Sequence, residues 1–160
     1  MTAARVVRTG GDLPLAGDSL FGLMREVLAK GKPFRFRARG LSMSPFIKDG
    51  DVLTVAPLGT APRAGDVAAF LHPATGRLVV HRMIRKRVGR YEFKGDNAHE
   101  VEGGVGLERI LGIVTSVERE GREVGLARRA GRALAGLSRT GLLRKAVGAA
   151  RRAGVRRGRR

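Results

Sequence analysis

Residues 40–51 read Gly-Leu-Ser-Met-Ser-Pro-Phe-Ile-Lys-Asp-Gly-Asp, a turn-rich stretch between two strand-like segments. Before it, residues 34–39 (Phe-Arg-Phe-Arg-Ala-Arg) alternate strictly between apolar and basic side chains, which is typical of a half-buried strand. After it, the apolar run 52–56 ends at Pro57. Glycine, serine, proline and aspartate between two such runs indicate a turn. The stretch therefore predicts β-structure in which a serine-bearing turn joins two strands.

The same pattern continues toward the C-terminus. Gly-Asp pairs at 50–51, 65–66 and 95–96 mark strand edges, because glycine tolerates positive φ and aspartate caps its own turn. Further strands are predicted over residues 67–71, 78–86, 90–93 and 109–118. Many short strands separated by turn signals favour a mainly β fold of curled antiparallel sheets. We expect this β-domain to cover residues 32–124.

A helical lead is predicted over residues 1–31. Asp18 or Ser19 can cap a helix that runs to about Lys30, and Gly31 is a plausible stop. The apolar residues at positions 20, 23, 24, 27 and 28 form one amphipathic stripe.

The charge is concentrated at the C-terminus. The net charge is +18, and residues 125–160 hold 12 Lys and Arg with no Asp or Glu. Apolar residues at helical spacing between these arginines predict an amphipathic helix, which several glycines weaken. A basic tail indicates an anionic partner, and an anionic membrane surface is our first expectation. Nucleic acid is the weaker alternative, because the tail has no aromatic residue to stack on bases, and a solvated end is the third.

Composition excludes several kinds of site. There is no cysteine, which rules out disulfides, thiolate catalysis and cysteine-ligated zinc. The three histidines, at positions 72, 81 and 99, lack ligand spacing, so we expect no metal and no cofactor. No signal peptide is recognisable, and no stretch reaches the ~20 apolar residues of a membrane-spanning helix. The expected location is cytoplasmic or peripheral to a membrane.

Three polar residues in this predicted β-domain are candidates for catalytic chemistry. Ser42 lies in the turn, His81 lies in the strand-like run 79–84, and Asp96 follows the next strand. A serine nucleophile, an imidazole base and an acid that orients it are what acyl transfer at neutral pH requires.

Four short boxes in the sequence resemble those of signal peptidases. Ser-Met-Ser-Pro followed by Gly-Asp resembles the nucleophile box, and three further boxes follow in the family's order and at similar spacing. The boxes are residues 40–51, Gly-Asp-Val-Ala-Ala-Phe at 65–70, Val-His-Arg-Met-Ile at 80–84 and Lys-Gly-Asp-Asn at 94–97. The resemblance covers roughly residues 36–118 and implies the β-fold of the signal peptidase and LexA-type proteins.

The resemblance also implies roles for individual residues. Bacterial type I signal peptidases and LexA-type repressors have Lys where this chain has His81, so the chain resembles the histidine branch of ER-type and archaeal enzymes. Ser42 would attack the peptide carbonyl, and its backbone N–H would help to form the oxyanion hole. His81 would take and return the proton. Asp96 would orient the imidazole, with Glu102 as the alternative acid. Met43 is expected to pack or to line the substrate pocket.

The resemblance implies a serine endopeptidase that cleaves a precursor or leader peptide in trans. One alternative is a LexA-like regulatory protein that cleaves itself, for which Ala16-Gly17, 25 residues before Ser42, is a candidate site. Against it, we expect no helix-turn-helix domain in the 39 residues before Gly40. The other alternative is a catalytically silent binding module with a basic surface.

Overall fold

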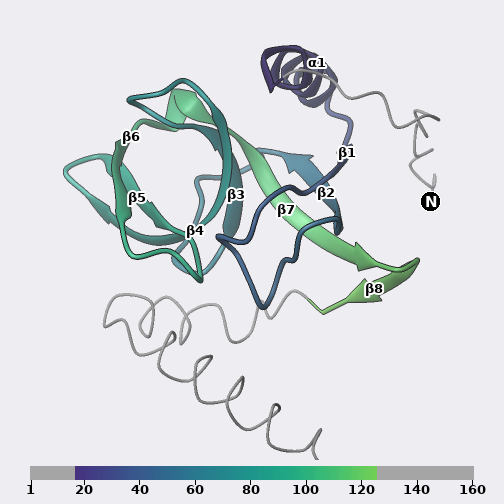
Figure 1. The fold of residues 1–160 in the computed structure, drawn as a ribbon. Coiled ribbons are helices and arrows are strands. Elements are labelled where there is room, and N and C mark those ends of the chain that lie inside the picture. Colours follow the sequence, from purple (N-terminus) through teal and green to yellow (C-terminus); the bar gives the residue numbers. More distant parts are fainter. Residues whose placement is uncertain (1–16, 126–160) are drawn as a thin grey trace, which may run out of the picture.

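The computed structural model describes residues 17–125, which form one helix and a single antiparallel sheet of eight strands (Figure 1). The elements are α1 (Gly17–Ala29), β1 (Phe34–Arg37), β2 (Val52–Pro57), β3 (Val67–Leu71), β4 (Leu78–Arg87), β5 (Arg90–Lys94), β6 (Val101–Val105), a 3₁₀ turn (Leu107–Arg109), β7 (Ile110–Arg119) and β8 (Arg122–Val124). No helix in this part of the chain is long and apolar enough to cross a bilayer.

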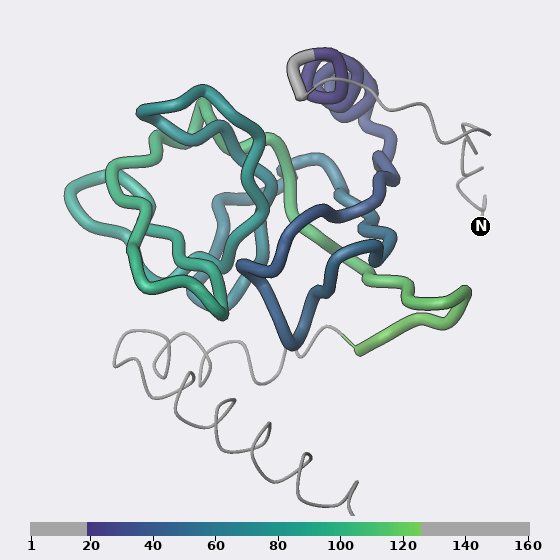
Figure 2. The backbone as a smooth tube through the Cα atoms, viewed as in Figure 1, coloured from purple at the N-terminus to yellow at the C-terminus, as the bar shows by residue number. Residues whose placement is uncertain are grey.

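The strand order is β1-β2-β7-β3-β4-β5-β6, and β8 pairs with the end of β7. The long strand β7 pairs with β3 over its first residues, 110–113, and with β2 over residues 112–118, so it links the two halves of the sheet. The chain from β3 to β6 curls round on itself, whereas β1, β2 and β8 extend to the other side, with α1 next to β1 and β2 (Figures 1 and 2).

The curled sheet has a core on each side of its bend. One core lies under α1, where Met24 and Leu28 pack with the buried residues of β1, β2 and β7. The other lies inside the curl, where the rings of Phe70 and Phe93 stack with centroids 4.3 Å apart. In the absence of tryptophan, aliphatic side chains and a few phenylalanines fill both cores.

The structure confirms the predicted mainly β antiparallel fold and the helix before it, and it adds two strands. Strand β6 has the sequence Val-Glu-Gly-Gly-Val, which lacks apolar alternation, and its backbone pairing with β5 defines it. Strand β8 is three residues long and closes a hairpin at Glu120 and Gly121, which both have positive φ. Residues 1–16 of the predicted lead 1–31, and the predicted helix of the basic tail, lie outside the described residues.

Candidate active site

The turn that carries Ser42 is a loop closed at its base. The Ala38 N–H donates to the Asp51 carbonyl at 2.7 Å, and the Gly50 N–H donates to the Ala38 carbonyl at 2.9 Å. Met43 and Ile47 point into the core and are 4% and 3% exposed. Two hydrogen bonds at the base and two apolar anchors therefore hold the serine between β1 and β2.

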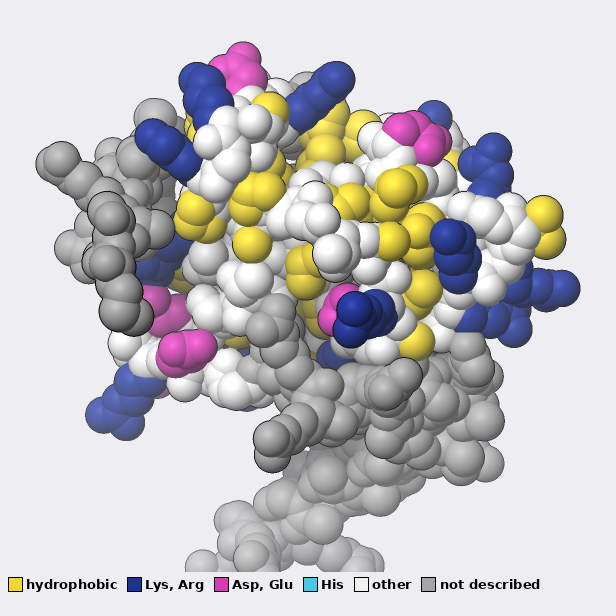
Figure 3. Space-filling view, turned by 180° about the vertical axis from the view of Figure 1, so that it is seen from behind, with side chains coloured by type: hydrophobic (Ala, Val, Ile, Leu, Met, Phe, Trp, Pro, Cys, Tyr) yellow, Lys and Arg dark blue, Asp and Glu magenta, His cyan; other side chains and the backbone are white. Residues whose placement is uncertain are grey.

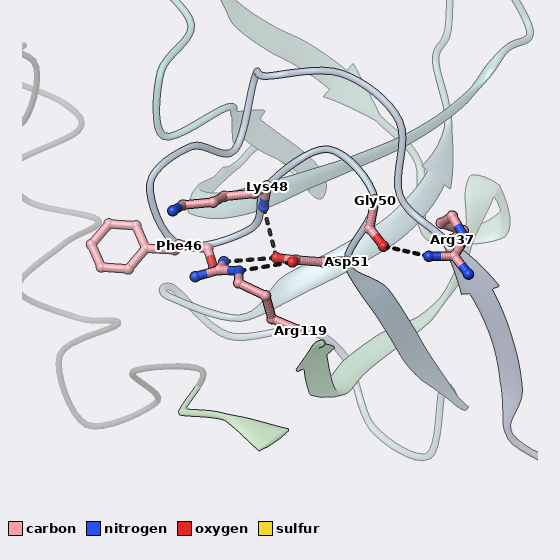
Figure 4. A network of polar contacts seen from close by, with 6 residues as sticks. All are labelled: Arg37, Phe46, Lys48, Gly50, Asp51 and Arg119. Atoms are coloured by element: carbon pink, nitrogen blue, oxygen red, sulfur yellow. Dashed lines mark hydrogen bonds and ion pairs between the residues drawn. The ribbon is translucent and has the colours of Figure 1, made fainter. Parts of the chain in front are cut away.

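Asp51 strengthens this base (Figure 4). Its carboxylate accepts two hydrogen bonds from the Arg119 guanidinium, at 2.9 and 2.8 Å, and one from the Lys48 N–H at 2.8 Å. Burial raises the pKa of the Asp51 carboxyl, but Arg119 and the Lys48 N–H outweigh it and hold this pKa below its usual value of 3.8. Arg119 also donates to the Phe46 carbonyl, so one ion pair fixes the loop to β7.

Ser42 and His81 meet at the mouth of this loop. The Ser42 side chain is solvent-exposed, and its Oγ lies 2.9 Å from His81 Nε2. His81 lies on β4 and is only 6% exposed, with its ring in an edge contact with Phe70. The imidazole is thus held rigidly with one nitrogen toward an accessible hydroxyl, as a serine–histidine pair requires.

The second nitrogen of the imidazole meets Glu102. His81 Nδ1 lies 2.5 Å from Glu102 Oε2, and the Glu102 side chain is 17% exposed. Glu102 projects from β6, whose pairing with β5 places it opposite Phe93. A carboxylate on Nδ1 fixes the tautomer in which Nε2 is free to accept the hydroxyl proton.

The carboxylate of Asp96 contacts Arg82, not the imidazole of His81. Both of its oxygens accept hydrogen bonds from Arg82, at 2.8 Å each, and the two side chains are 0% and 1% exposed. Arg82 also donates to the Gly65 carbonyl at 2.8 Å and lies over the Phe46 ring. The expectation that Asp96 orients His81 is therefore corrected, because the Asp96 carboxylate is engaged by the neighbouring arginine and Glu102 occupies the position on the imidazole.

The segment after β5 packs directly against the serine turn. The Asn97 N–H donates to the Ser42 carbonyl at 2.7 Å, and the Asn97 side-chain amide donates to the Leu41 carbonyl at 3.3 Å. A Cβ at Gly95 would lie 2.6 Å from the Ser42 carbonyl oxygen and 3.0 Å from His81 Nε2. The Lys-Gly-Asp-Asn box thus positions the serine backbone. The box pointed to this segment, but its sequence did not show that Gly95 and Asn97 act on Ser42.

The Ser42 N–H is available as a donor. Among residues 17–125 it has no hydrogen-bond partner, whereas the Gly40 N–H donates to Asp49. The predicted oxyanion donor is thus free to bind an incoming oxygen beside the hydroxyl. Met43 is buried and also lines the groove described next, so the packing and pocket-lining expectations both match its location.

A groove of about 770 Å³ leads up to Ser42 and His81. Two segments far apart in the sequence, residues 36–40 and residues 77–81, line it as its walls, and the buried residues Met43, Ile47 and Leu53 contribute its apolar floor. Two walls of near-extended backbone suit an extended peptide better than a compact small molecule. Within the described part of the chain, no three His, Asp or Glu side chains gather to hold a metal ion.

Comparison with known proteins identifies the family of this chain. No curated protein sequence matches the chain. The model of the Peptidase S24-like family matches residues 11–114, a span that includes the serine turn, β4 and β6. The chain therefore belongs to the Peptidase S24-like family, in the superfamily of LexA-type and signal peptidase-like proteins, and this membership implies a hydrolase of the serine peptidase type.

Proposed function

We propose that this protein is a serine endopeptidase that cleaves a precursor or leader peptide in trans, with Ser42 as nucleophile and His81 as base. We assign the orienting acid to Glu102 instead of Asp96. The continuous contact from Ser42 through His81 to Glu102, beside a groove of about 770 Å³ that Ser42 and His81 help to line, is the observation that carries the proposal.

The proposed reaction assigns a role to each of these contacts. Ser42 Oγ attacks the peptide carbonyl carbon while its proton moves to His81 Nε2, and Glu102 stabilises the imidazolium through Nδ1–H. The Ser42 N–H donates to the carbonyl oxygen as negative charge develops there. His81 then protonates the leaving amine, which departs and leaves an ester on Ser42. Water, deprotonated by His81, hydrolyses this ester and regenerates the hydroxyl.

Family membership alone also allows self-cleavage of the LexA type. The accessible Ser42 and the open groove favour action in trans. Of residues 17–125, only the two walls, the floor and Leu20 of α1 line the groove, and no further segment of this part of the chain occupies it as a substrate would. Ala16, half of the candidate self-cleavage pair, lies outside the described residues. The third candidate function is a catalytically silent binding module with a basic surface. Such a module would not need a free Ser42 N–H beside an imidazole that contacts both Ser42 and Glu102. An anionic membrane remains our proposed partner for residues 125–160.

The deciding experiment is a comparison of protein N-termini in cells that carry wild-type protein or Ser42→Ala at equal abundance. Peptide N-termini that vanish in Ser42→Ala and persist in Ser44→Ala would support proteolysis. Ser44→Ala is the matched control, because it removes a hydroxyl from the same turn that does not contact His81. An unchanged set of N-termini under several growth conditions would favour the binding module.

Purified protein separates the two proteolytic alternatives. Self-cleavage within one chain loses mass at a rate independent of protein concentration. Cleavage in trans leaves the enzyme intact and is first order in enzyme at low concentration. A Ser42-dependent mass loss that persists on dilution would overturn the proposal of action in trans.

A further inference from the structure

The groove beside Ser42 and His81 has a one-sided charge. Among the described residues, its lining includes Arg37, Arg39 and Arg77 and no Asp or Glu. Arg37 and Arg39 belong to the wall 36–40 and Arg77 to the wall 77–81, so two segments far apart in the sequence both bring cationic side chains to the groove. All three residues are exposed to solvent.

Two of these cations have no counter-ion among the residues that the structure describes. Within residues 17–125, the side chains of Arg39 and Arg77 make no hydrogen bond or ion pair, whereas Arg37 donates to the Gly50 carbonyl at 3.0 Å. Two acids close to the serine–histidine pair in the structure or the sequence are already engaged, because Glu102 contacts His81 and Asp49 accepts from the Gly40 N–H. A guanidinium is a strong, directional partner for a carboxylate.

Exposed arginines alone would not indicate a site, since Lys and Arg side chains also spread over the face seen in Figure 3. The location of the groove arginines distinguishes them. Arg39 precedes Ser42 by three residues and Arg77 precedes His81 by four. Even fully extended, four residues span at most about 14 Å, so both arginines lie within the length of a short bound peptide.

We propose that the groove selects peptides with an Asp or Glu side chain within about four residues of the cut, which Arg39 and Arg77 bind. This inference rests on the proposed peptidase function and specifies its substrate class. The apolar floor takes the small or apolar side chains of an extended peptide, and side chains that project toward the rims reach the arginines. The carboxylate gains a charge-assisted hydrogen bond from a guanidinium.

The test uses matched peptides in a mixed library with amidated C-termini, so that a terminal carboxylate cannot replace a side chain. Each cleaved peptide is paired with one in which Asp is replaced by Asn at a single position within four residues of the cut. For wild-type protein we expect kcat/KM to be about fivefold to tenfold higher for the Asp peptide at low salt. The ratio should fall toward twofold near 0.5 M NaCl, because salt screens exposed charges.

Variants locate the effect in the groove. Arg39→Gln with Arg77→Gln should bring the Asp/Asn ratio close to one. Arg39→Glu with Arg77→Glu should bring the ratio below one, so that the Asn peptide of each pair is cleaved faster. Arg122→Gln is the matched control, since Arg122 is an exposed arginine of β8 outside the groove, and it should keep the wild-type ratio. Equal cleavage of Asp and Asn peptides by wild-type protein would overturn the charge preference while proteolysis stands.

Binding measurements keep the two proposals apart. The same peptide pairs, labelled with a fluorophore, are titrated with Ser42→Ala protein and followed by anisotropy. If wild-type protein cleaves nothing but Ser42→Ala binds Asp peptides about fivefold more tightly, dependent on Arg39 and Arg77, the charge preference stands and the peptidase proposal fails. Equal binding of Asp and Asn peptides together with no cleavage would overturn both.

Discussion

Arg82 and Asp96 form a bidentate ion pair that is almost fully enclosed, with both N–O distances at 2.8 Å and side-chain exposures of 1% and 0%. Arg82 lies next to His81 on β4, and Asp96 lies next to Gly95 in the segment that contacts the serine turn. The pair thus joins the strand that carries the imidazole to the segment that supports the nucleophile. Its role is to hold two parts of the site in register.

Asp96→Asn should therefore act mainly on stability. Removal of one partner leaves the Arg82 charge buried without its counter-ion, which typically costs about 3–5 kcal/mol. We expect the free energy of unfolding in urea to fall by this amount. Glu118→Gln is the control, because it breaks the half-exposed pair with Arg35 and should cost at most about 1 kcal/mol. An Asp96→Asn protein as stable as wild type would contradict the structural role.

Glu102→Gln should act mainly on catalysis. An amide can no longer accept strongly from Nδ1–H or stabilise the imidazolium, and the corresponding Asp→Asn change in a known serine–histidine–aspartate triad lowers kcat by about 10⁴-fold. We expect a loss of about 10³-fold to 10⁴-fold in kcat with little change in melting temperature, since the Glu102 side chain reaches solvent. A loss of stability with unchanged kcat in the folded fraction would refute the assignment.

The contrast between Asp96 and Glu102 shows how far the sequence could predict this site. The serine, the histidine and both acids were recognisable from their boxes and spacing. Which acid reaches the imidazole depends on β6, where Glu102 stands opposite Phe93 of β5. That strand has two glycines and no apolar alternation, so its pairing could not be predicted from periodicity.

The fold was more predictable than the site because burial leaves a periodic signature. Strands β2, β3, β4 and β7 carry apolar residues that pack in the two cores, and the apolar runs in the sequence predicted all four strands. Arg119 illustrates the opposite case. Its ion pair with Asp51 spans 68 positions in the chain, and no local pattern connects the two residues.

Gly95→Ala should impair the site without unfolding the protein. The added Cβ would lie 2.6 Å from the Ser42 carbonyl oxygen, a backbone atom that can move only if the serine turn shifts. Because a shift of about 1 Å can cost about 10²-fold in rate, we expect kcat/KM to fall by about 10-fold to 100-fold. Gly103→Ala in β6 is the control, since its Cβ would meet only Glu92 Cγ at 3.9 Å. Full activity of Gly95→Ala would show that the turn tolerates displacement.

The lowered pKa of the Asp51 carboxyl should make the stability of the protein depend on pH. Because its carboxyl pKa is lower in the folded chain than its usual value of 3.8, folding favours the ionised form. The resulting stabilisation is fully present above about pH 5 and is lost as pH falls through the usual value toward the folded pKa. Asp51→Asn lacks this contribution and should be about 2 kcal/mol less stable at pH 7, where it forfeits hydrogen bonds to a charged partner.

Urea unfolding of wild type and Asp51→Asn between about pH 2 and pH 7 measures this contribution directly. The difference in unfolding free energy should be constant from pH 7 down to about pH 5 and then shrink as the wild-type carboxyl takes up a proton. Other carboxylates titrate in both proteins, so the difference between the two curves isolates Asp51. A difference that grows as pH falls would mean that the carboxyl pKa is raised in the folded chain, and the proposed anchoring of the serine loop by ionised Asp51 would have to be abandoned.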